Sequence, residues 1–201
     1  MSELKVNKIS PATGTAFALG DSGDTFTLPS GATIVNSGTA TGFGGGGVLQ
    51  VKSTEKTSSF STTSATLIAI TGMSVTITPT LATSKILVIS TCGGAGGVGT
   101  GYSQMQLLRD TTAIHIGDAD GSRDRVTATL YSANSDGTMH PTIMVLDNPA
   151  STSAITYSLK GKCESTNKFF FNSFYTDSDD AIQGARSASS ITAIEIAVGV
   201  L

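Results

Sequence analysis

The motif best suited to catalysis in this sequence is Gly-Asp-Ser near the N-terminus. The extended stretch Phe17–Leu19 runs into Gly20, Asp21 and Ser22, an arrangement that can present a nucleophilic serine. The serine then needs a histidine to accept its proton, and hydrolases built this way carry Asp-x-x-His near the C-terminus. The last histidine, His140, has no aspartate three residues before it. We therefore expect Ser22 to be a turn residue and the chain not to be an enzyme.

Histidine and acidic residues are candidates for binding a metal ion or a sugar. The chain has two histidines, His115 and His140, whereas catalytic zinc needs three protein ligands. The stretch 118–124 (DADGSRD) is similar to part of a calcium loop but lacks the glutamate at the twelfth position. We therefore expect no metal and no cofactor. Carboxylates that could contact a receptor on a host surface, or hold calcium, lie in a predicted loop: Asp177, Asp179 and Asp180.

The composition indicates an all-β protein. Only 13% of the residues are charged, compared with about 25% in an ordinary soluble domain. Thr, Val and Ile are abundant, and their branching at Cβ favours strands. No segment keeps a helical period. A surface with so few charges favours an oligomer over a free monomer.

Several partners and locations are disfavoured by the charge and hydropathy pattern. The formal net charge is −3 and no Lys/Arg cluster is present, so we expect no nucleic-acid partner. No apolar stretch reaches the length of a membrane helix, and the N-terminus lacks the apolar core of a signal peptide. We expect synthesis in a cytoplasm and no membrane insertion. Cys92 and Cys163 are expected to be reduced, buried thiols, although one disulfide is the alternative.

The chain divides into three parts. Residues 1–41 alternate short apolar stretches with turn signals, and they have too few large side chains for a core of their own. Residues 42–47 are predicted to be a hinge because Gly44, Gly45, Gly46 and Gly47 have no side chains to pack. Residues 48–201 are of ordinary domain size. The residues of the first part that we expect to mediate attachment or oligomerisation are Leu4, Val6, Ile9, Phe17, Phe26 and Leu28.

The body, residues 48–201, is predicted to be a β-sandwich or jelly roll because short strands alternate with turn signals. The run 85–90 predicts a strand buried on both faces, and 74–79 alternates. Phe169, Phe170 and Phe171 are expected in the core or an interface, with sugar stacking as the alternative. The predicted strands are 48–56, 65–70, 73–79, 85–92, 102–109, 113–117, 125–131, 141–146, 155–163, 168–175 and 191–198.

The C-terminal stretch 190–201 alternates and then becomes wholly apolar. Chain ends are usually polar and frayed, so an apolar end is expected in the core or in a subunit interface. The residues proposed for that interface are Ile191, Ile194, Ile196 and Val198.

Two N-terminal stretches, 4–16 (LKVNKISPATGTA) and 20–34 (GDSGDTFTLPSGATI), resemble the start of tail-fibre or appendage proteins of marine tailed bacteriophages. The ending 188–196 is also similar to the last strand of trimeric heads with a tumour-necrosis-factor-like jelly roll. Further stretches that resemble the bacteriophage proteins are 60–64, 71–79, 108–110 and 116–119.

The resemblance implies a structural protein of a virion, with an N-terminal attachment segment and a distal, jelly-roll-like β head that is commonly a homotrimer. Since no long repetitive shaft is present, a fibre would be short. A capsid decoration or spike protein and a lectin-like receptor-binding head are the alternatives. The implied partners are copies of the chain itself, other virion proteins of tail or capsid, and a glycan or protein of the host surface.

Overall fold

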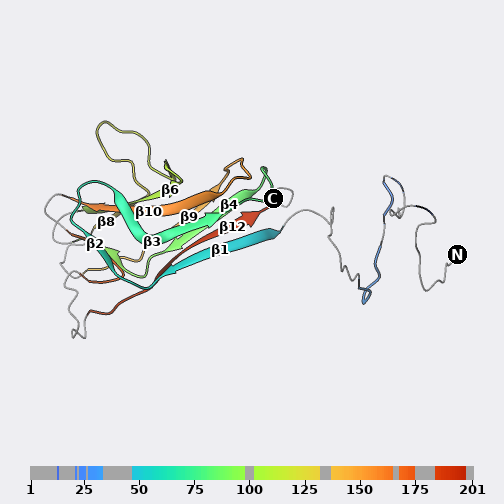
Figure 1. Cartoon of the computed structure of the whole chain (residues 1–201), viewed down its shortest axis with the longest axis horizontal. Helices are drawn as coiled ribbons and strands as arrows, with labels where there is room; N and C mark the ends of the chain where they lie inside the picture. Colours follow the sequence, from blue (N-terminus) through green and yellow to red (C-terminus); the bar gives the residue numbers. More distant parts are fainter. Residues whose placement is uncertain are drawn as a thin grey trace. The chain divides into compact units, whose positions relative to one another are not determined.

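The structure is a computed structural model in which the chain forms two compact units, residues 1–43 and 44–201 (Figure 1). In the first unit the backbone N–H of Asp24 donates to the carbonyl of Asp21, 3.0 Å away, and that of Ala32 donates to Pro29 at 3.0 Å. Both hydrogen bonds close turns where the sequence carries turn signals, at 20–24 (GDSGD) and 29–31 (PSG). The structure describes residues 13, 21, 23–25, 27–33, 47–97, 102–131, 137–164, 168–174 and 184–197.

All regular elements among the described residues are strands, which confirms the all-β prediction. The strands are β1 (Val48–Lys56), β2 (Phe60–Thr62), β3 (Ile68–Ile77), β4 (Lys85–Thr91), β5 (Ala95–Gly96), β6 (Tyr102–Arg109), β7 (Thr112–Ile114), β8 (Ala128–Tyr131), β9 (Thr142–Asp147), β10 (Ile155–Cys163), β11 (Phe169–Phe171) and β12 (Ser189–Ile196).

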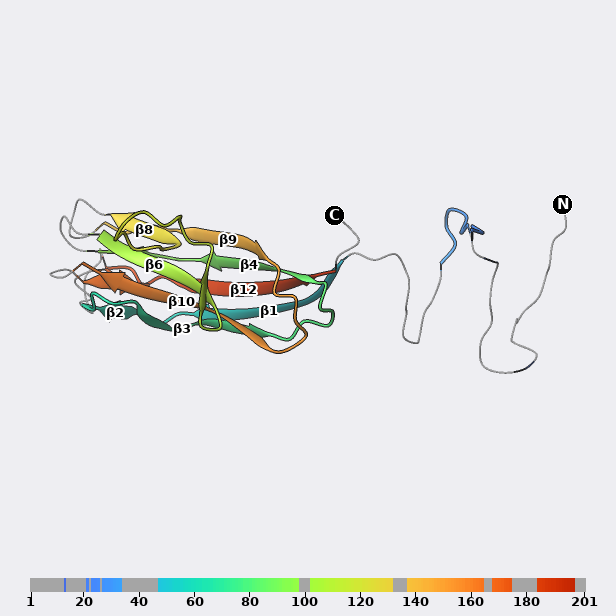
Figure 2. The same cartoon turned by 90° about the horizontal axis from the view of Figure 1, so that it is seen from above.

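Two antiparallel sheets form the layers of the body. The four-stranded sheet has the order β1-β12-β4-β9. The five-stranded sheet has the order β3-β10-β6, and both β7 and β8 pair with the free side of β6. A small third sheet, β2-β11-β5, adjoins them. Figure 2 shows β4, β9, β12 and β1 in one layer, with β6, β8 and β10 in the other.

The core lies between the two layers, because most of the long strands alternate buried residues with more exposed ones. Ile86 and Val88 of β4 face Leu107 of β6 and Leu159 of β10, and all four are fully buried. Burying such side chains contributes about 1.5 to 3 kcal/mol each. Phe169–Phe171 are also fully buried, which confirms their predicted packing role.

One predicted strand break is wrong. Residues 65–70 and 73–79 were expected to be separate strands, but β3 runs continuously through them. Gly72 has a φ of +85°, and the pairing with β10 shifts register between Ser158 and Lys160. Glycine tolerates this conformation, so the strand accommodates a bulge instead of ending. The very short strands β2 and β5 were not predicted, because two or three residues carry no periodicity.

The prediction that the run 85–90 is buried on both faces is also wrong for the single chain. Ile86, Val88 and Ser90 face the core and are buried, whereas Leu87 and Ile89 point the other way and are only half-buried. Apolar runs of this kind are typical of strands covered on both faces. The outer face of β4 is therefore more apolar than a solvent-facing strand requires.

Candidate functional site

The outer face of the four-stranded sheet carries rows of apolar side chains. In an antiparallel sheet, directly paired residues share a face. Val51 pairs with Ile194, Ile194 with Leu87, and Leu87 with Leu146, so one apolar row crosses all four strands. The neighbouring rows place Val48 beside Ile196, and Ile89 beside Met144; the second of these rows continues into the hydroxyls of Thr192 and Ser53, 2.8 Å apart. We call this set the apolar sheet face: Val48, Val51, Leu87, Ile89, Met144, Leu146, Ile194 and Ile196.

Several side chains of the apolar sheet face are well exposed. Met144 is 62% exposed, Val48 60%, Val51 54% and Leu146 44%. Within these rows, all of them described, the one charged side chain is Lys85, at the margin opposite Ile196. The face is about 20 Å wide and 20 Å long from strand and row spacings, or roughly 400 Å². The largest apolar patch on a typical monomer is of this size and is often functional.

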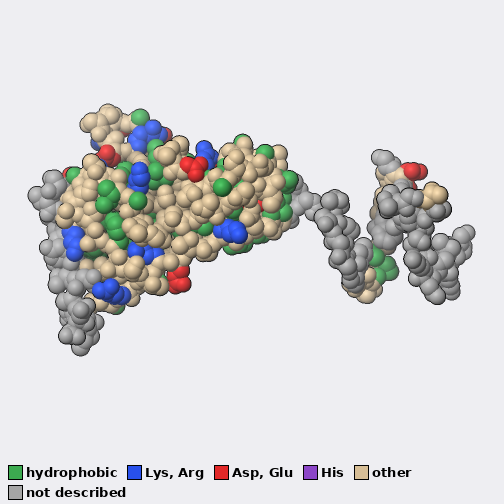
Figure 3. Space-filling model, in the orientation of Figure 1, with side chains coloured by type: hydrophobic (Ala, Val, Ile, Leu, Met, Phe, Trp, Pro, Cys, Tyr) green, Lys and Arg blue, Asp and Glu red, His purple; other side chains and the backbone are tan. Residues whose placement is uncertain are grey.

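The outer face of the five-stranded sheet is different in character. Its side chains are mainly hydroxyls, amides and amines, including Thr76 and Thr156, whose hydroxyl oxygens lie 2.8 Å apart. This is the usual polar face of an antiparallel sheet that meets water. The two sides of the body are therefore unequal: one suits water, and the other suits a partner. On the face drawn in Figure 3 the Lys and Arg side chains are scattered and form no continuous stripe.

A buried carboxylate anchors the inner side of the four-stranded sheet. Glu195 of β12 is fully buried and accepts hydrogen bonds from Gln50 Nε2 (2.6 Å), Thr80 N (2.7 Å) and Thr80 Oγ1 (2.8 Å). Burial by itself would raise the pKa of Glu195, but the hydrogen bonds from Gln50 and Thr80 outweigh it and hold the pKa below its ordinary value. Glu195 thereby joins β1 and the β3–β4 loop to the sheet that carries the apolar face.

A second carboxylate links the two layers. Asp147 of β9 accepts hydrogen bonds from Arg109 of β6, 2.9 Å away, and from the hydroxyl of Tyr157 of β10, 2.6 Å away. Burial and the neighbouring Asp147 raise the pKa of Tyr157. Because these three side chains come from both sheets, they hold the layers in one relative position. The carboxylates of Glu195 and Asp147 therefore both accept hydrogen bonds that hold the fold together.

A cavity of about 260 Å³ opens on the polar outer face of the five-stranded sheet. It lies where β6 begins and β10 ends, beside the β7–β8 connection. The pairing of β6 with β10 sets Gln104 beside Lys162, and Tyr102 begins the same strand. Asp124 comes from the β7–β8 connection, where Lys162 binds it at 2.5 Å. Glu164, directly after β10, completes the rim.

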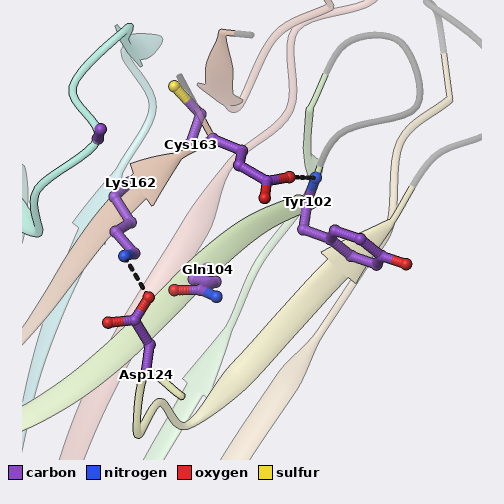
Figure 4. Close-up of a pocket in the computed structure, with 7 residues that line it drawn as sticks. Tyr102, Gln104, Asp124, Lys162 and Cys163 are labelled. Carbon is purple, nitrogen blue, oxygen red and sulfur yellow. Dashed lines mark hydrogen bonds and ion pairs between the residues drawn. The ribbon is translucent and has the colours of Figure 1, made fainter. Parts of the chain in front are cut away.

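The cavity combines an aromatic side with hydrogen-bond acceptors. In Figure 4 Lys162 reaches Asp124 on one side of Gln104, and Tyr102 lies on the other. Tyr102 is 49% exposed, and its ring centroid lies 5.2 Å from that of Tyr131 on the paired strand. Gln104 Oε1 is buried and has no hydrogen-bond partner among the described residues. A buried acceptor of this kind is rare and calls for a donor.

The structure separates the residues that the sequence suggested for the interface. Ile194 and Ile196 lie on the apolar sheet face, half-buried. Ile191 is a correction: it is fully buried in the core of its own chain, because it is an odd number of residues from Ile194 and therefore points to the opposite face. Leu28 of the attachment set is 44% exposed, and Gly47 of the hinge is exposed. The other predicted residues lie outside the described ones: Leu4, Val6, Ile9, Phe17, Phe26, Gly44, Gly45, Gly46, Val198, Asp177, Asp179 and Asp180.

The residues considered for catalysis or metal binding are not brought together. His115 follows β7 and His140 precedes β9, so they flank strands of different sheets, and both are exposed. In the stretch 118–124, Asp120 pairs with Arg123 at 3.0 Å. Across the described ranges no three His, Cys, Asp or Glu side chains are close enough to share a metal ion. Ser22 lies outside the described residues.

Sequence reasoning missed the cavity because no local motif marks it. Its lining comes from β6, β10 and the β7–β8 connection, and only the strand register brings these together. Comparison of the sequence with protein-family models and with curated proteins finds no match. Within the part of the chain that is described, no helix is long and apolar enough to cross a membrane.

Proposed function

We propose that the chain is a non-catalytic structural subunit that assembles with copies of itself through the apolar sheet face, and that it forms the head of a short appendage on a bacteriophage particle. The apolar sheet face is the observation that carries the proposal. Exposed Met144, Val48 and Val51 would be costly to leave in water, and covering them follows the same physics that forms the core.

A second copy is the partner that best fits this face. The run 85–90 is apolar on both sides, which suits a strand permanently covered by its own assembly. Three copies that each cover about 400 Å² would bury roughly 1,200 Å² in the whole assembly, or about 400 Å² at each of three interfaces, so residues beside the apolar sheet face must add to each contact to reach the ~1,000 Å² expected of a biological interface. Charges are nearly absent from the face, so it would not need a partner of opposite charge.

The strand order supports a jelly-roll head. A jelly roll has eight main strands. When these are numbered in chain order, the strand orders of its two sheets are 1-8-3-6 and 2-7-4-5. The four-stranded sheet, β1-β12-β4-β9, and the path β3-β10-β6-β8 of the five-stranded sheet correspond to these orders. The virion assignment itself rests on the N-terminal resemblance of residues 4–34. In this proposal residues 1–41 attach the head to the particle.

Light scattering on the full chain tests the assembly. A homotrimer has a mass of about 61 kDa, three times 20.4 kDa. Met144→Asp places a charge on the apolar sheet face, where an assembly would have to bury it unpaired. We expect this variant to fall to about 20 kDa while remaining folded, since Met144 is 62% exposed in the single chain.

Ser74→Asp is the matched control, because Ser74 lies exposed on the outer face of the other sheet. It should keep the mass of the unmodified protein. A mass of 20 kDa for the unmodified chain, or equal masses for both variants, would contradict assembly through this face. Mass spectrometry of purified bacteriophage particles tests the virion assignment, and detection only in the cell lysate would refute it.

A further inference from the structure

We infer that the cavity between Tyr102, Gln104 and Glu164 binds a neutral or amino sugar. The inference goes beyond the proposed assembly and does not depend on it, because the cavity lies on the sheet opposite to the apolar sheet face. Its volume of about 260 Å³ lies just below the ~300 to 1,000 Å³ of drug-sized ligand pockets. One sugar ring is a ligand of suitable size.

The hydrogen-bonding groups of the cavity call for a ligand rich in donors. Gln104 Oε1 has no hydrogen-bond partner among the described residues and an accessible area below 1 Å², so a ligand reaches this acceptor when the amide turns towards the cavity. Among the described residues, the carboxylate of Glu164 accepts one hydrogen bond, from the backbone N–H of Tyr102 at 3.5 Å, so it has acceptor capacity left. Neighbouring hydroxyls of a sugar donate to such acceptors at close spacing.

The aromatic side of the cavity matches the other half of a sugar. Tyr102 and Tyr131 pair across β6 and β8 and are 49% and 46% exposed. Tyr102 lines the cavity and Tyr131 packs against its ring, so the C–H face of a pyranose can lie against Tyr102. The β7–β8 connection is held in place before binding, because Gln106 Nε2 donates to the carbonyl of Arg125 at 2.9 Å and Lys162 binds Asp124.

The charge of the cavity indicates which kinds of sugar it can bind. Asp124 and Glu164 carry two negative charges against the single positive charge of Lys162, which already binds Asp124. The formal net charge of −1 repels uronic acids, sialic acids and phosphates. The negative charge does not repel neutral hexoses and N-acetylhexosamines, and it attracts a protonated amino sugar.

Saturation-transfer NMR on the full chain tests the inference, with glucose, galactose, mannose, N-acetylglucosamine, glucosamine and glucuronate as probes. At a probe concentration of about 10 mM, tenfold above a weak Kd of ~1 mM, we expect transfer to at least one neutral or amino sugar and none to glucuronate. Absence of transfer to every probe would overturn the inference. Equal transfer to glucose and glucuronate would overturn it as well.

Two variants separate binding from folding. Tyr102→Ala and Gln104→Met should each weaken sugar binding by about tenfold or more. Gln104→Met should also leave the midpoint of thermal unfolding unchanged or higher, since it removes a buried acceptor that lacks a partner. Lys160→Ala, on the same face of β10 but outside the cavity, is the control and should bind as the unmodified chain does.

Sugar binding that survives both substitutions would refute the site. A lower unfolding midpoint for Gln104→Met would show instead that its amide is structural. The native mass should not change in any of these variants, so a failure of sugar binding is distinguishable from a failure of the proposed assembly.

Discussion

Replacing Glu195 tests whether a single buried carboxylate holds the edge of the four-stranded sheet. Glu195→Leu removes the carboxylate that accepts three short hydrogen bonds. The three donors that lose this acceptor are Gln50 Nε2, Thr80 N and Thr80 Oγ1. A buried donor left unsatisfied costs about 1 to 3 kcal/mol, and some of these donors will recover water at the loop. We expect the free energy of unfolding to fall by about 3 to 5 kcal/mol.

The same site predicts a dependence of stability on pH. The pKa of Glu195 in the folded chain lies below the ordinary value of 4.5, so in acid the unfolded chain binds more protons than the folded one. The contribution of Glu195 is therefore fully present above about pH 4.5 and is lost as the pH falls through its folded pKa. Glu195→Gln cannot titrate, and its stability should fall less steeply in this range.

Urea unfolding followed by far-ultraviolet circular dichroism measures both effects, at one fixed protein concentration because the chain is expected to assemble. Glu55→Gln is the control, since Glu55 lies exposed on β1 and should change stability by less than about 0.5 kcal/mol. The reasoning fails if Glu195→Leu costs less than about 1 kcal/mol. It also fails if Glu195→Gln and the unmodified chain lose stability equally between about pH 5 and pH 3.

Two further predictions concern the loops and the thiols. Gly93→Ala should destabilise the chain by about 2 kcal/mol or more, because a Cβ there would lie 2.1 Å from the carbonyl oxygen of Ala188. Gly117→Ala, with no neighbour within 4 Å, should be nearly neutral in the same thermal unfolding assay. Cys92 and Cys163 are buried, and burial raises the pKa of Cys92 to about 12. Neither thiol should react with a disulfide reagent near pH 8 until the chain is unfolded, and prompt reaction of the native protein would contradict this.

The strands and turns of this protein were largely readable from its sequence. The alternation in 74–79 predicted that Val75 and Ile77 would be buried together, and they are. Glycine was harder to interpret, since Gly72 marks a bulge within β3 where a break was expected. The same residue type can end a strand or bend it, and the choice depends on whether β10 lies alongside.

The sequence could not assign the apolar residues of β12 and β4 to the core or to the surface. Ile191 and Ile194 look alike in the chain, but the first is in the core and the second is on the apolar sheet face. Alternation tells which residues share a face, whereas the packing of the second sheet decides which face is covered.

By itself the sequence determined the all-β class, the positions of most strands and the turns at 21–24 and 29–32, because strand period and turn chemistry act over a few neighbouring residues. Only the tertiary structure decided which apolar face is left uncovered and that Tyr102, Asp124 and Lys162 meet at one cavity. Those outcomes depend on pairings between segments far apart in the chain, such as Val48 with Ile196, 148 residues apart, and Gln104 with Lys162, 58 residues apart. No local pattern encodes such a register, since it is set by which strands pair and by how the two sheets bury one another.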